Sequence, residues 1–76
     1  MKKAIKKSIC KTYSSGNKYW ELIDGTFHRE DDPAVIFAYG DKRWFLNGKK
    51  YSEQDYYRKL YKRGIITREE LFIHLL

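Results

Sequence analysis

Short turn signals recur through the first two-thirds of the chain and limit what it can fold into. They are Asp24-Gly25, Gly40-Asp41 and Asn47-Gly48. Asn-Gly is the strongest hairpin signal, because both central residues of a type I′ turn need a positive φ. Turns this close together leave room only for short extended segments between them, so the pattern predicts an antiparallel β-meander.

Residues typical of β-strands fill the segments between these turns. Residues 34–39 are the clearest strand, with the smaller side chains on one face and bulky ones on the other. Two apolar faces indicate that both are covered, or that one makes contact with a partner. The other predicted extended segments are residues 5–13, 18–23, 26–28, 42–46 and 49–51.

Helix-capping patterns appear only in the last third of the chain. Ser52 is a predicted N-cap with Asp55 three residues later, and Gly64 follows the last residue of the helix, which ends near Arg63. Thr67 and Glu70 predict a capping box that opens a short terminal helix. The sequence therefore predicts one α+β domain over residues 1–76, with a β-rich part (1–51) of four to five short antiparallel strands and a helical part (52–76).

The terminal helix is apolar nearly all round, and such a segment must pack on its own sheet or on a second subunit. A chain of 76 residues buries only about 60% of its unfolded surface, so association with another copy is favourable. We therefore predict a homodimer. The predicted interface residues are Leu71, Phe72, Leu75 and Leu76.

Charge is divided into blocks along the chain. Residues 1–18 carry six lysines and no acid, residues 19–41 carry one base and six acids, and residues 42–63 carry eight bases and two acids. Such a distribution steers an anionic partner more effectively than the net charge of +6 alone. We predict RNA, bound mainly through its phosphates and with low sequence specificity. The predicted binding residues are Lys2, Lys3, Lys6, Lys7, Lys42, Arg43, Lys49, Lys50, Arg58, Lys59, Lys62 and Arg63.

Thirteen of the residues are aromatic, and several alternate with lysines on the predicted strands. Bases of single-stranded RNA stack on aromatic faces while basic side chains hold the phosphates. A small core also needs aromatic rings, and we expect Trp20 and Trp44 to belong to it. The aromatic residues predicted to be more exposed are Tyr39, Tyr51, Tyr57 and Tyr61.

The sequence offers little for catalysis or for metal binding. His28, Glu30, Asp31 and Asp32 could in principle hold a metal, but neighbouring residues of an extended chain point in alternate directions. Pairing of these acids with Arg29 or with other bases is the better interpretation. The single cysteine, Cys10, cannot form an intrachain disulfide, which favours a reducing compartment, and we expect it to be buried. We predict a protein that is not an enzyme and has no cofactor and no metal.

One stretch resembles a known pattern. His28-Arg29-Glu30-Asp31-Asp32-Pro33-Ala34, followed by Trp44-Phe45-Leu46-Asn47-Gly48-Lys49, is similar to H-R-x-D-G-P-A and W-x-x-N-G-K, which short proteins and repeats of large bacteriophages carry. The match covers roughly residues 24–57. Asp32 replaces the glycine of the pattern, and Tyr39-Gly40 replaces a more common Asp-Gly or Asn-Gly. The resemblance implies a phage accessory protein acting in the host cytoplasm, with a hairpin module whose motif residues are structural.

Three functions are compatible with these features. The first is an RNA-binding protein that inhibits a host defence factor, such as a toxin–antitoxin nuclease. The second is a protein–protein inhibitor of a host enzyme that needs no nucleic acid, which the acidic residues 19–41 favour. The third is a structural module associated with the virion. No stretch approaches the roughly 20 apolar residues of a membrane span, so we expect a soluble protein without a membrane partner.

Overall fold

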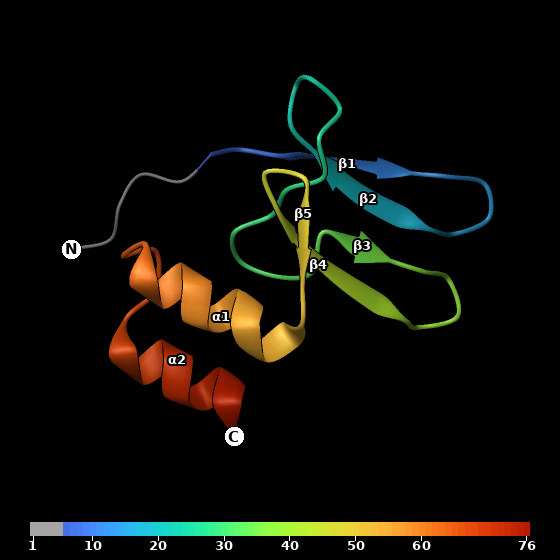
Figure 1. Cartoon of the computed structure of the whole chain (residues 1–76). Coiled ribbons are helices and arrows are strands. Elements are labelled where there is room, and N and C mark those ends of the chain that lie inside the picture. Colours follow the sequence, from blue (N-terminus) through green and yellow to red (C-terminus); the bar gives the residue numbers. More distant parts are fainter. Residues whose placement is uncertain (1–5) are drawn as a thin grey trace.

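The computed structural model of the chain describes residues 6–76 (Figure 1). Within these residues, five antiparallel strands form one sheet in which their spatial order follows the chain, and two helices come after it. The predicted α+β class, with a meander followed by two short helices, is therefore confirmed. The elements are β1 (Ile9–Thr12), β2 (Lys18–Glu21), β3 (Val35–Ile36), β4 (Lys42–Leu46), β5 (Lys49–Tyr51), α1 (Glu53–Lys62) and α2 (Arg68–Leu75).

The Asn47-Gly48 turn joins β4 to β5 as its sequence predicts. Both residues have positive φ, 51° and 82°, and the turn pairs Leu46 with Lys49. A glycine is required at position 48 for a second reason, because a Cβ there would lie 2.9 Å from the side chain of Thr26. The turn is thus held against a neighbouring loop as well as by its own conformation.

The predicted strand 34–39 is shorter in the structure, where β3 contains only Val35 and Ile36. The reason is that the backbone turns directly after it: the Phe37 N–H donates to the Asp41 carbonyl, and the Gly40 N–H donates back to the Phe37 carbonyl. Gly40 has a φ of 103°, which allows this tight closure. The bulky residues of the segment therefore lie in a turn between β3 and β4 rather than on a sheet face.

Capping residues determine where both helices begin. The Ser52 hydroxyl accepts from the Asp55 N–H, and α1 ends at Lys62, followed by the C-cap Arg63 and by Gly64 at a φ of 75°. Thr67 and Glu70 form the predicted capping box of α2, in which each side chain accepts from the backbone N–H of the other residue. These groups satisfy N–H donors that a helix terminus otherwise leaves unpaired.

The core lies between one face of the sheet and α1. Leu46 of β4 packs against the buried residues Tyr56, Tyr57, Leu60 and Ile65. Trp44 is half-buried against this cluster, as predicted. Trp20, also predicted to be in the core, is half-buried too, but its ring is covered by the Arg29 guanidinium, 3.8 Å from the ring centroid.

Residues 28–34 and 44–49, the two halves of the sequence motif, meet at one place in the fold. His28 is fully buried; its Nδ1 accepts from the Asn47 N–H (2.8 Å), and its Nε2 is hydrogen-bonded to the buried Glu30 carboxylate. Because Nδ1 accepts, the ring proton is on Nε2 and is donated to Glu30. The two halves of the motif are thus joined directly, because Asn47 of one half donates to His28 of the other.

Arg29 and Tyr56 hold the loop between β2 and β3. The Arg29 side chain pairs with Asp31 (2.8 Å) and Asp32 (3.7 Å), as predicted for this acidic run. The buried Tyr56 hydroxyl donates to the Arg29 and Asp32 carbonyl oxygens, so α1 is fastened to the same loop. The charged motif residues therefore serve the fold.

The terminal helix α2 packs beside α1 but buries little of its own surface. Leu71 and Leu75 are half-buried, whereas Phe72 is 57% exposed and Leu76 is fully exposed. Ile73, at 67%, is exposed as well. No helix in residues 6–76 is long and apolar enough to cross a membrane.

Candidate nucleic-acid interface

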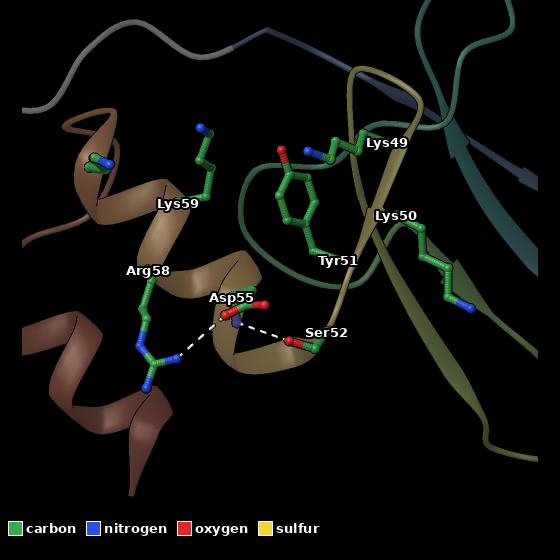
Figure 2. Close-up of a pocket in the computed structure, with 8 residues that line it drawn as sticks. Lys49, Lys50, Tyr51, Ser52, Asp55, Arg58 and Lys59 are labelled. Atoms are coloured by element: carbon green, nitrogen blue, oxygen red, sulfur yellow. Dashed lines mark hydrogen bonds and ion pairs between the residues drawn. The ribbon is translucent and has the colours of Figure 1, made fainter.

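An open hollow of about 420 Å³ lies between β5 and α1 (Figure 2). Its rim contains five basic side chains and one acidic one. The lining residues are Lys49, Lys50, Tyr51, Ser52, Asp55, Arg58, Lys59 and Lys62. Five of the predicted binding residues are therefore brought together here, and we call this hollow the basic groove.

The strand side of the basic groove follows from β alternation. Lys49 and Tyr51 are two residues apart on β5 and extend toward α1, whereas Lys50 between them points the other way (Figure 2). The Lys49 Nζ lies 5.3 Å from the centre of the Tyr51 ring. The tyrosine ring thus forms an apolar wall beside an exposed cation.

The helix side of the basic groove is set by where α1 begins. Ser52, the only residue between β5 and α1, caps the helix, so the strand turns at once into the helix. Positions 55, 58, 59 and 62 follow the i, i+3, i+4, i+7 spacing of one helix face. The opposite face holds the buried residues Tyr56, Tyr57 and Leu60. Packing of that apolar face therefore turns the basic one outward.

The charges in the basic groove are only slightly compensated. Arg58 lies 3.4 Å from Asp55, one turn earlier on α1. Among residues 6–76, no ion pair is recorded for the four lysines of the groove. Several cations near one another with a single acid attract an anion with several charges more strongly than a single charge.

The other predicted basic residues do not line this groove. Lys42 is exposed at the start of β4, and Arg43 lies 3.7 Å from Asp41 with its guanidinium over the Phe37 ring. Arg63 is half-buried at the C-cap of α1. Lys2 and Lys3 lie outside the described residues.

Lys6 and Lys7, which were also predicted to bind, do not line the basic groove. They lie just before β1, and β1 and β5 are at opposite edges of the sheet. Lys6 nevertheless reaches the β4–β5 turn, where its Nζ donates to the Asn47 side chain (2.7 Å). Lys6 and Lys7 also border a hollow of about 220 Å³ with Trp20, Arg29, Glu30 and Asp31.

Most acids of residues 19–41 have partners inside the domain. Glu21 pairs with Lys11 (3.2 Å), and Arg29 holds two aspartates as described above. Asp24 closes a turn in which hydrogen bonds from Thr26 lower the pKa of its carboxyl. The acidic block of the sequence is thus used largely to stabilise loops and strands.

Two of the four tyrosines predicted to be exposed are so: Tyr39 is 73% and Tyr61 44% exposed. Tyr51 is half-buried. The prediction for Tyr57 is wrong, because α2 covers it and stacks the His74 ring on it, with 3.7 Å between ring centres. Burial raises the pKa of the Tyr57 hydroxyl, and it raises that of Tyr56 further.

Two further expectations concern Cys10 and the acidic cluster at 28–32. Cys10 is exposed, contrary to the prediction, because β1 is an edge strand whose four residues are all exposed. Among residues 6–76, no group of three or more His, Cys, Asp or Glu side chains is placed to hold a metal ion.

The sequence did not indicate that Ser52 and Asp55 line the basic groove, although their helix-capping pattern placed them at the start of α1, beside it.

No protein family, curated protein or solved structure matches this chain. The resemblance of residues 24–57 to bacteriophage proteins therefore stays a prediction from its motif residues.

Proposed function

We propose that the protein binds RNA in the basic groove between β5 and α1. The observation that carries the proposal is the gathering of five basic side chains, from a strand and a helix, around one hollow with one acid. Lysine and arginine contacts to phosphate supply most of the affinity of nonspecific nucleic-acid binding. We expect low sequence specificity, because such contacts do not read the bases.

The shape of the groove favours a chain of phosphates over a single small anion. Its cations are spread along β5 on one side and along about one turn of α1 on the other, from Arg58 to Lys62. A polyphosphate backbone can contact cations on both sides, whereas one phosphate contacts only a few. Tyr51 adds an aromatic wall on which a base can stack.

A binding experiment with a matched control tests the groove. Fluorescence anisotropy with a short labelled single-stranded RNA compares the wild-type protein with Lys59→Ala/Lys62→Ala. The control is Lys18→Ala/Lys42→Ala, which removes the same charge from two exposed lysines of β2 and β4, both paired in register with Ile36.

We expect the groove variant to lose at least ten-fold in affinity and the control to change little. Equal losses would show that total charge, and not the groove, determines binding. A DNA strand of the same sequence that binds equally well would overturn the choice of RNA.

The exposed apolar residues of α2 support a protein contact beside RNA binding. Phe72, Ile73 and Leu76 are mostly exposed, while the described part of the chain has seven buried hydrophobic residues. A core this small gains from association with a second copy through α2. Light scattering at micromolar concentration tests the homodimer: a 9.2 kDa particle contradicts it.

The bacteriophage resemblance supports a wider role for the RNA complex. In this role, binding serves to inhibit a host defence factor such as a toxin–antitoxin nuclease. Capture of partners from infected cells, with and without nuclease treatment, tests it. A host protein that is retained equally after nuclease treatment would favour direct inhibition without nucleic acid.

A further inference from the structure

A second hollow, of about 390 Å³, lies on the sheet around β1 and β2. Its volume is within the range of small-ligand sites, about 300–1,000 Å³. Three aromatic residues, one serine and one glutamate line it. The lining residues are Tyr13, Ser15, Tyr19, Glu21 and Phe27, and we call this site the aromatic hollow.

Strand register places these side chains on the sheet face that α1 does not cover. Tyr19 and Glu21 alternate with Trp20 on β2, so they share a face, and Tyr19 is paired with Lys11 of β1. Phe27 joins the same face through its bridge to Glu21. The core residues of β4 that pack on α1, Trp44 and Leu46, alternate with Phe45, which contacts Phe27.

The rings form two walls at right angles. Tyr13 meets Tyr19 edge-on, with 5.0 Å between centres and an angle of 86°. Tyr19 and Phe27 are nearly parallel, at 14° and 5.5 Å. Tyr13 is 51% exposed, so its ring is accessible from solvent. A planar ligand can stack on one wall while its edge meets the other.

The Glu21 carboxylate favours a ligand that carries N–H donors at the edge of an aromatic ring, as a heteroaromatic base does. Its side chain is only 10% exposed, and its Oε1 lies 3.2 Å from the Lys11 Nζ. A carboxylate at the edge of an aromatic site accepts hydrogen bonds from ring or amino N–H groups. A cationic ligand would be attracted less strongly here, because Lys11 already balances the negative charge of the Glu21 carboxylate.

Basic residues connect the aromatic hollow with the basic groove. Lys50 lines the groove but points away from α1, and it is paired with Phe45, which contacts Phe27 of the hollow (Figure 2). Arg43 is paired with Val35, and Val35 is paired with Tyr19. An RNA backbone that leaves the basic groove across β5 can therefore contact Lys50 and Arg43 before it reaches the aromatic hollow.

We infer that the aromatic hollow binds an unpaired, amino-bearing base of the same RNA, with Tyr13 as the stacking wall and Glu21 as the acceptor. This inference rests on the proposed RNA binding. It makes the protein a reader of single strands, because a base inside a duplex cannot enter the hollow.

Anisotropy with three RNA probes of equal length tests the stacking wall: an oligo-A strand, an oligo-U strand and a duplex. Tyr13→Ala should weaken oligo-A binding about five-fold or more and leave duplex binding unchanged. Tyr13→Phe keeps the ring and should keep the affinity. Glu21→Gln should weaken oligo-A binding, because a neutral amide oxygen accepts the adenine amino group less strongly than a carboxylate does.

The two proposals fail differently. If the wild-type protein binds none of the probes, RNA binding itself is wrong. If it binds, and Lys59→Ala/Lys62→Ala weakens every probe while Tyr13→Ala weakens none, only the aromatic hollow is wrong. NMR titration of the wild-type protein with free adenosine adds a test without substitutions. We expect shifts at the Tyr13, Tyr19 and Phe27 ring protons, and shifts with tetramethylammonium instead would overturn the inference.

Discussion

If the basic groove binds RNA as proposed, the salt dependence of binding measures how many of its cations contact phosphate. The basic groove has five basic residues, of which Arg58 is partly compensated by Asp55. If all five neutralise a phosphate of a single strand, log K falls with log salt at a slope of about −3.5; without two of them the slope is about −2.1. Between about 50 and about 200 mM salt, these slopes correspond to affinity losses of about 130-fold and about 20-fold.

The perturbation is Lys59→Ala/Lys62→Ala, and the assay is anisotropy at four or more salt concentrations. We expect the slope of the variant to be shallower than that of the wild-type protein by about 1.4. The control Lys18→Ala/Lys42→Ala should keep the wild-type slope. An unchanged slope in the groove variant would refute the reasoning, because it would mean that neither lysine displaces a counterion. A flat wild-type dependence would remove the phosphate-contact mechanism altogether.

Three further predictions concern the fold. Leu60→Ala leaves a cavity in the core at a fully buried position, and urea unfolding should show a loss of about 2–5 kcal/mol. Gly48→Ala places a side chain at a φ of 82° and 2.9 Å from Thr26, and should cost at least about 1 kcal/mol in the same assay. Burial raises the pKa of Tyr56 and Tyr57 in the folded protein, so stability should persist below pH 10 and fall as the pH rises above it. Unfolding curves together with tyrosinate absorbance at increasing pH check this, and an unchanged stability above pH 10 contradicts it.

The parts of the fold that local chemistry determines could be predicted from the sequence. Asn47-Gly48 makes its hairpin because the turn needs positive φ, and Ser52 and Thr67 begin helices because their hydroxyls accept backbone N–H groups. The burial of Tyr57 could not be predicted in this way. It depends on α2 folding back over α1 so that His74 reaches its ring, a contact between residues 17 positions apart.

The residues of the basic groove could be predicted from the sequence more readily than those of the aromatic hollow. A single residue, Ser52, separates β5 from α1, so basic residues on both sides of it had to lie near one another. The hollow depends on register: Tyr13 and Tyr19 meet only because the turn between β1 and β2 pairs Lys11 with Tyr19. Phe27 joins them through a bridge that no local pattern indicated.

The alternation of basic and acidic blocks along the chain does not produce the same alternation on the surface. Pairs within the domain take up much of the acidic block, and they join acids to bases of other segments or to close neighbours: Lys11–Glu21, Arg29–Asp31, Arg29–Asp32 and Arg43–Asp41. Glu30, in the same block, is buried against His28. The acidic residues that favoured a protein partner in the sequence are therefore largely engaged, which weakens that alternative. The lysines around α1 remain in excess over the acids near them, and this excess supports the proposal that the groove binds an anionic chain.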